Sequence, residues 1–149
     1  MHPYRYRVAL QLQHPQADLR ELGSYLHAAP SRSWQAGDPR VTPKGTVLPG
    51  LRQDSSWSAD LTPGEHPADS REEDLEAFIE RQLDRLSPHA GRLQALNADG
   101  GRAGFFIGLF CGDNSGFVLS PALMAKAAAL GVELGFDLYP PEPPSAAAS

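Results

Sequence analysis

The run RAGFFIGLFC, residues 102–111, constrains the fold most, because no other stretch of the chain is as apolar. Its alternate positions carry large apolar side chains on both faces of a strand, with Phe105, Ile107 and Leu109 on one face and Phe106 and Phe110 on the other. Such a strand is usually an interior strand covered on both sides. Gly112 and Gly116 then bracket residues 113–115, DNS, which favour a turn. We therefore predict a β-hairpin over 102–120, with the rest of the chain built against it.

Apolar spacing predicts the other elements. Period-two alternation indicates strands over 4–13 and 132–139, and two shorter strands are expected over 31–35 and 55–61. Leucine-rich stripes of helical spacing follow Asp18, Ser70, Pro88 and Pro121. Ser70 with Glu73 forms a capping box that predicts the start of the second helix. The connection between the two short strands is rich in Pro and Gly, which predicts no regular element there.

The order of these elements predicts an α+β fold, with a mostly antiparallel sheet of about five to six strands and helices packed on it. A ferredoxin-like βαββαβ core with insertions would combine the first strand and helix, the hairpin, and the last helix and strand. The first and last strands would then be antiparallel neighbours, with Arg5 and Arg7 facing Glu133 and Asp137. The alternative is a plain antiparallel sheet with all helices on one face.

Length and composition suit one α+β domain over residues 1–139, followed by a Pro/Ala/Ser tail over 140–149 that is expected to be disordered. No apolar run approaches the roughly 20 residues that a membrane helix needs. The N-terminal residues alternate as in a strand and do not resemble a signal peptide. The single Cys111 cannot form an internal disulfide, so a cytoplasmic location is expected.

Charge is unevenly distributed along the chain. The net charge of −5 argues against nucleic-acid binding. Residues 31–53 hold four cations against Asp38 alone, whereas residues 60–84 hold nine acids against two arginines. Either the basic segment lies beside the acidic segment of its own chain, or it binds an external anion or an acidic partner.

The motifs of common catalytic and cofactor sites are missing from the sequence. The five histidines are not spaced as metal ligands, either with one another or with Cys111. The sequence contains no phosphate loop, no dinucleotide-binding Gly motif and no Gly-x-Ser-x-Gly nucleophile elbow. We therefore predict no catalytic residue, metal site or cofactor, and favour a non-enzymatic protein while leaving an unrecognised enzyme open.

Residues 31–57 combine Arg, Lys and Trp in one irregular segment, a composition typical of binding surfaces. The candidate binding residues are Ser31, Arg32, Trp34, Arg40, Lys44 and Trp57. Arginine donors and backbone N–H groups near glycine could hold a carboxylate or a phosphate. Either tryptophan could instead be a core residue that lies over Gly108.

Several short motifs resemble the bacterial family catalogued as domain of unknown function 4279. They are the Tyr-Arg-Val strand ending in His-Pro, PSRSW with a following Gly, TPKG, and GLF with GFVLSP in the predicted hairpin. The resemblance covers about Tyr4 to Tyr139. It implies a small stand-alone cytoplasmic α+β protein, and it implies no catalytic residues because the family has no established activity.

Two functions follow from these observations. The first is a non-enzymatic protein-interaction module, immunity-like or regulatory, that contacts a protein partner through residues 31–57. The alternative is a domain that binds a small molecule or anion through Arg32, Lys44 and a tryptophan. A deep pocket lined by Arg32, Lys44 and Trp57 would favour the alternative, and a flat exposed patch would favour the module. Neither function involves nucleic acid or a membrane, and the sequence makes no prediction of oligomeric state.

Overall fold

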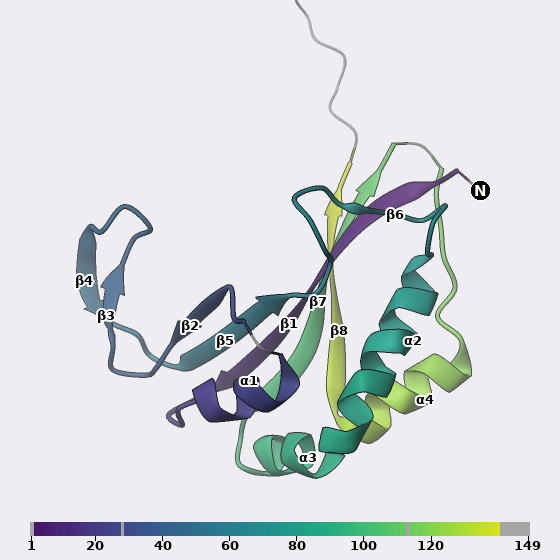
Figure 1. Ribbon diagram of the computed structural model, residues 1–149. Coiled ribbons are helices and arrows are strands. Elements are labelled where there is room, and N and C mark those ends of the chain that lie inside the picture. The colour runs from purple at the N-terminus through teal and green to yellow at the C-terminus, as the bar shows by residue number, and fades with distance from the viewer. Residues whose placement is uncertain (1, 28, 113, 141–149) are drawn as a thin grey trace, which may run out of the picture.

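A six-stranded, mostly antiparallel sheet is the frame of the molecule, which confirms the α+β class (Figure 1). The computed structural model of the protein describes residues 2–27, 29–112 and 114–140. The elements are β1 (Tyr4–His14), α1 (Arg20–Leu26), β2 (Arg32–Trp34), β3 (Pro39–Val41), β4 (Val47–Leu51), β5 (Ser55–Asp60), β6 (Ala68–Asp69), α2 (Leu75–Leu86), the 3-10 helix η1 (Ser87–His89), α3 (Ala90–Ala98), β7 (Arg102–Cys111), α4 (Pro121–Leu130) and β8 (Val132–Tyr139). Apart from Pro140, the predicted tail lies outside the described residues.

The strand order corrects the ferredoxin-like prediction. The sheet runs β2-β5-β1-β7-β8, and the short β6 pairs with β1. β1 therefore lies between β5 and β7, and β8 pairs with β7 in parallel rather than with β1. The predicted charge pairing of the first and last strands is also wrong. Arg7 is paired with Asp60 at 2.7 Å and Glu133 with Arg102 at 2.8 Å, because these are the residues on the neighbouring strands.

The hairpin prediction is correct for its first arm only. β7 is an interior strand, with β1 on one side and β8 on the other. Residues 116–120 form no strand, because both ladder positions beside β7 are already taken. They lead instead to α4, where the Ser120 Oγ accepts a hydrogen bond from the Leu123 N–H at 3.2 Å. Asp113, in the predicted turn, lies outside the described residues.

One face of the sheet carries the core and the other is open. All the helices pack on the first face, where β1 and β7 alternate between buried and more exposed residues. Phe105, Ile107 and Leu109 are buried on this face, whereas Phe106 and Phe110 are exposed on the other. The predicted coverage of β7 on both sides is therefore wrong, because no described helix lies over the open face.

The start of α2 differs from the predicted capping box. The helix begins at Leu75, and the carboxylate of Asp74 accepts the hydrogen bond from the Ala77 N–H at 2.8 Å. Ser70 has a different role, because its hydroxyl accepts a hydrogen bond from the Tyr4 N–H at 2.9 Å and so ties this turn to β1. The predicted apolar stripe is confirmed, with Leu75, Phe78, Ile79, Leu83 and Leu86 all buried.

Tyr6 gives the fold a dependence on alkaline pH. Its side chain is buried on β1, and its hydroxyl donates to the Glu73 carbonyl at 2.7 Å. Burial raises the pKa of Tyr6 well above its usual value of 10.0, and the nearby Glu73 charge raises it further. The folded state thus holds this proton more tightly than the unfolded state does. Its contribution to stability is complete below pH 10 and is lost as the pH rises above that value.

We therefore expect the free energy of unfolding to begin to fall near pH 10, the usual tyrosine pKa, and to go on falling as the pH rises toward the higher pKa of the folded state. Urea denaturation at several pH values measures this slope. Tyr6→Phe should make the slope shallower, and an unchanged slope in this variant would assign the pH dependence to other groups.

Candidate functional site

A separate two-stranded sheet, β3 with β4, projects from the body beyond β2 (Figure 1). We call it the β3–β4 arm, residues 39–51. The prediction of no regular element here is wrong, because the Thr-Pro-Lys-Gly motif is the turn that joins two strands. The Gly45 N–H donates to the Thr42 carbonyl at 2.9 Å, and Gly45 has a φ of +88°, which glycine adopts without strain. Proline at the second and glycine at the fourth position suit such a turn.

Large aliphatic side chains on the arm are exposed. Val47 is 70% exposed and Leu51 60% exposed, and Val41 and Leu48 are exposed as well. Val41 and Val47 face each other across the ladder, so these two side chains form one apolar surface. A two-stranded hairpin is marginally stable alone, and exposed apolar patches mark interaction sites.

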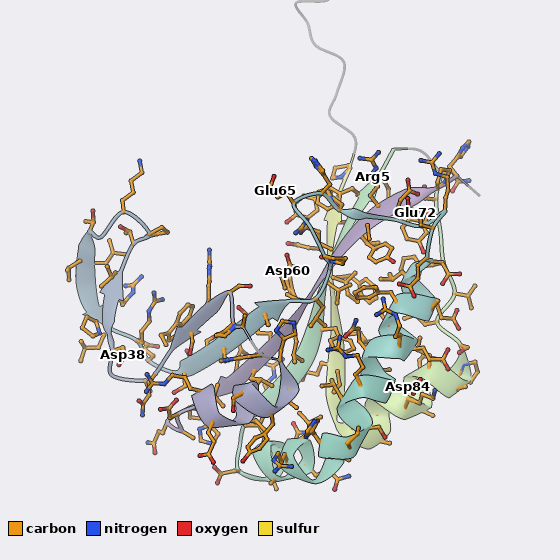
Figure 2. The ribbon with its side chains drawn as sticks, viewed as in Figure 1. Arg5, Asp38, Asp60, Glu65, Glu72 and Asp84 are labelled. Carbon is orange, nitrogen blue, oxygen red and sulfur yellow. The ribbon has the colours of Figure 1, made fainter. Side chains whose placement is uncertain are left out.

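The cations around the arm do not pair with the acids of residues 60–84. Within the part of the chain that the structure describes, no ion pair joins the two segments. Figure 2 shows Asp60, Glu65, Glu72 and Asp84 on the body, while the arm extends away from them. The cations of the basic segment thus make no ion pair with these acids among the described residues, although its first residue, Ser31, is hydrogen-bonded to Asp60.

A hollow of about 540 Å³ lies at the base of the arm, lined in part by Arg32, Trp34, Asp38 and Arg52. The guanidinium carbon of Arg52 lies 3.9 Å from the centre of the Trp34 ring, a cation–π contact. The indole Nε1 of Trp34 and the Nε of Arg52 are buried without a hydrogen-bond partner among the described residues. Sequence reasoning did not select Arg52, although it belongs to the same cationic segment.

The structure places the six candidate residues in four different settings. Arg32 and Trp34 line the hollow, and Lys44 lies exposed at the tip of the arm. Arg40, also on the arm, donates to the Pro49 carbonyl at 3.2 Å. Ser31 and Trp57 belong to the main sheet and its core instead.

Ser31 and Trp57 join β5 to its neighbours. The Ser31 hydroxyl accepts a hydrogen bond from the Asp60 N–H at 3.0 Å, and the Ser31 N–H donates to the Ser58 carbonyl at 2.7 Å. Trp57 is 1% exposed and lies in the core against Gly23. Arg32, Lys44 and Trp57 therefore do not line one pocket.

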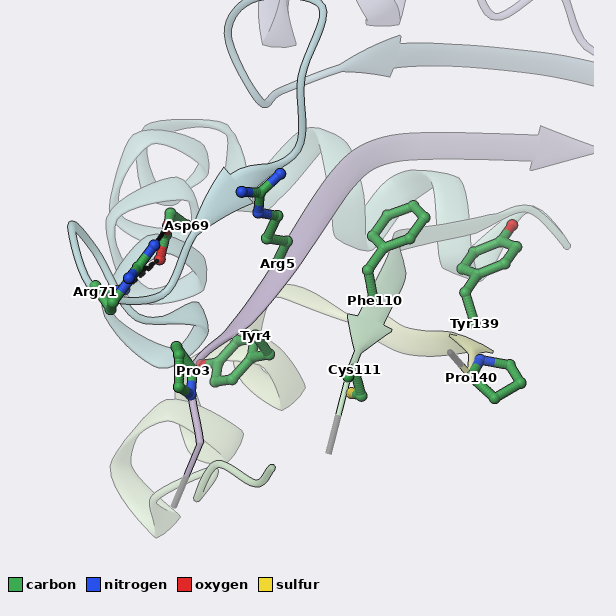
Figure 3. A pocket seen from close by; sticks show the side chains of 10 residues that line it. Pro3, Tyr4, Arg5, Asp69, Arg71, Phe110, Cys111, Tyr139 and Pro140 are labelled. Atoms are coloured by element: carbon green, nitrogen blue, oxygen red, sulfur yellow. Dashed lines mark hydrogen bonds and ion pairs between the residues drawn. The ribbon is translucent and has the colours of Figure 1, made fainter. Parts of the chain in front are cut away.

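A second hollow, of about 640 Å³, lies at the other end of the sheet (Figure 3). Asp69, Arg5, Phe110 and Tyr139 are register partners on four adjacent strands, and together they form a row across the open face. The Phe110 and Tyr139 rings are stacked with their centres 4.8 Å apart. A hydrogen bond from Arg71 lowers the pKa of Asp69 to about 2. Sequence reasoning missed this row because it took β7 to be covered on both faces.

In residues 2–27, 29–112 and 114–140, no three His, Cys, Asp or Glu side chains are grouped so that they could hold a metal ion. None of the helices in these residues has the length and apolar character needed to cross a membrane. Cys111 ends β7 as a half-buried free thiol.

The comparison with known families agrees with the motifs of the sequence. The family model described as Domain of unknown function (DUF4279) matches residues 3–141. The chain belongs to this family. Membership of DUF4279 brings no activity and no functional residues, because the description of the family states none. Searches of curated proteins and of solved structures found no match.

Proposed function

We propose that this DUF4279 protein is a non-enzymatic interaction module, immunity-like or regulatory, whose β3–β4 arm contacts a protein partner. The observation that carries the proposal is the exposure of four aliphatic side chains on one projecting arm. A cytoplasmic location belongs to the proposal, since a chain with the single Cys111 needs no oxidising compartment.

The arm combines two of the contributions that stabilise protein interfaces. Burial of Val47 and Leu51 against a partner would remove apolar surface from water. Arg40 and Lys44, together with Arg32 and Arg52 at its base, give residues 31–53 a cationic surplus over Asp38. Such a surplus favours an acidic partner surface and speeds association at low salt. We therefore propose an acidic protein as the partner.

Val47→Asp with Leu51→Asp is expected to abolish partner binding while leaving the fold intact. Both side chains are exposed, so their replacement removes little buried surface, whereas aspartate introduces a charge and desolvation penalty at the contact. Capture of partners from the native cell extract, followed by their identification, measures the effect. Retention of the wild-type partner should also weaken with added salt.

Met124→Asp is the matched control, because Met124 is an exposed apolar residue on α4, away from the arm. It should retain the partner that the arm variant loses, and both variants should melt near the wild-type temperature. Loss of the partner in the Met124 variant, with retention in the arm variant, would assign binding to another surface.

The hollow at the base of the arm supports a second candidate function, binding of a small anion. Arg32 and Arg52 both line it, and buried donors on Trp34 and Arg52 have no partner among the described residues. Inorganic phosphate should then raise the melting temperature of the wild type but not of Arg32→Ala. If the hollow binds no anion, phosphate should shift the melting temperatures of the two proteins by the same amount.

A further inference from the structure

β8 forms one edge of the sheet. It pairs with β7 over eight residues, Val132 to Tyr139, and pairs with no other strand within the described residues. The outer edge of such a strand presents unpaired backbone N–H and C=O groups, which can pair with a strand from another chain. The opposite edge differs, because β2 is only three residues long.

Large apolar side chains are exposed along β8 where the helices no longer cover it. Val132 is buried and Leu134 is half-buried, but Phe136 is exposed and Leu138 is 70% exposed on the same face. Val118, on the segment before α4, is 68% exposed. On the open face, the exposed ring of Tyr139 is stacked on Phe110. The second half of β8 is thus exposed on both faces, with Phe136 and Leu138 on the helix face and Tyr139 beside Asp137 on the open face.

The usual protections of an edge strand are absent from the sequence of β8. Natural edge strands carry prolines, lysines or bulges that oppose pairing with other chains. Residues 132–139 contain neither Pro nor Lys, and the β7–β8 pairing is continuous. Of the two acids, Glu133 accepts two hydrogen bonds from Arg102, at 2.8 and 3.2 Å. The carboxylate of Asp137 accepts a hydrogen bond from the Tyr139 hydroxyl at 3.2 Å.

We propose that two copies of this chain form a two-fold dimer by antiparallel pairing of β8 with β8, centred on Phe136. In this register the facing residues are Glu133 with Tyr139, Leu134 with Leu138, Gly135 with Asp137, and Phe136 with its own copy. Apolar residues then face apolar residues, and no acid faces an acid. Glu133 gains a phenol hydroxyl as its neighbour, and Asp137 lies opposite a glycine, which leaves room for its side chain.

Electrostatics and coverage argue against the registers centred on Gly135, Asp137 and Leu134. A register centred on Gly135 places Glu133 opposite Asp137, and one centred on Asp137 places two aspartates face to face, both of which are repulsive. A register centred on Leu134 leaves Leu138 and Tyr139 outside the pairing. Any register centred between two residues would place the helix face of one sheet beside the open face of the other. Among these registers, the one centred on Phe136 makes the strand self-complementary over the longest stretch, as a two-fold interface requires.

Sedimentation velocity of the full chain tests the dimer. We expect a concentration-dependent dimer in the wild type, and we expect Leu138→Lys to raise its Kd by about tenfold or more, as loss of a central contact does. Val47→Lys is the matched control, because Val47 has the same 70% exposure on the arm, and it should leave the Kd unchanged. A wild type that stays monomeric up to a protein concentration of about 100 µM would have only a very weak tendency to dimerise, and this result would overturn the proposal. So would a dimer that is lost in the Val47 variant but kept in the Leu138 variant.

Cysteine cross-linking tests the register in the Cys111→Ser background. Phe136→Cys should form a disulfide-linked dimer on oxidation, because facing residues in antiparallel strands have Cα atoms about 4.5–5.5 Å apart, within reach of a disulfide. Leu134→Cys alone should not cross-link, but an equal mixture with Leu138→Cys should do so. Cross-linking of Leu134→Cys with itself, and not of Phe136→Cys, would overturn the register. These readouts do not involve the arm, so they can fail without affecting the proposed function.

Discussion

Trp57→Ala is expected to lower the free energy of unfolding by about 3–5 kcal/mol, the range found when a buried large aromatic side chain is removed. Trp57 is almost completely buried, and it lies on β5 opposite Leu12 of β1, so it links the central strand to α1. Urea denaturation measures the loss. Trp34→Ala is the control, because Trp34 is only half-buried and should cost clearly less. Equal losses in the two variants would contradict the assignment of Trp57 to the core.

Gly23 provides a second test of the same contact. A Cβ built on Gly23 would overlap the Trp57 indole, so Gly23→Ala should destabilise the protein by about 1–3 kcal/mol, as overpacking does. In the Trp57→Ala background the same change should become neutral or stabilising, since alanine favours a helix more than glycine does. A cost of Gly23→Ala that is equal in both backgrounds would show that the two residues do not interact.

Local patterns predicted most elements of the fold. The alternation in residues 4–13 corresponds to β1, and the apolar stripe that begins at Leu75 corresponds to the buried face of α2. The Ser120-Pro121 start of α4 and its end before Gly131 were also predictable, because caps depend on a few adjacent residues. These predictions succeeded because each depends on interactions that are close in the sequence.

Strand order was not predictable in the same way. Whether β8 pairs with β1 or with β7 depends on which neighbours are already taken, and the residues of β8 do not encode that choice. The two-sided apolar pattern of β7 was also ambiguous. Phe106 and Phe110 indicate burial by their composition, yet no described helix covers their face of the sheet. Periodicity gives the faces of a strand, but it does not state which face is covered.

The candidate site was predicted as a segment but not as a structure. Val41 and the pair Val47-Leu48 flank the Thr-Pro-Lys-Gly turn, and this pattern could have indicated a hairpin. The abundance of Pro and Gly favoured an irregular connection instead. Trp57 was included because it is close to the basic loop in sequence, whereas β5 directs it into the core. Arg52 becomes recognisable as part of the hollow only once its contact with Trp34 is known.

Ile107→Ala and Phe106→Ala are expected to differ widely in stability, although the two residues are adjacent on β7. Ile107 is completely buried, so its truncation should cost about 2–5 kcal/mol. Phe106 is 47% exposed on the open face, so its truncation should cost about 1 kcal/mol or less, close to a surface substitution. Urea denaturation of both variants measures the difference in their free energies of unfolding. The comparison holds when the two variants show the same m-value.

This pair of variants separates a sheet that is covered on one face from a sheet covered on both. Gly135, the register partner of Phe106 on β8, adds no side chain that would cover its ring. Removal of the ring should therefore open no cavity, since much of its surface already contacts water. A loss for Phe106→Ala as large as that for Ile107→Ala would show that another chain or segment covers the open face in solution. The row of Arg5, Phe110 and Tyr139 on the same face would then be part of a buried interface rather than of an open hollow.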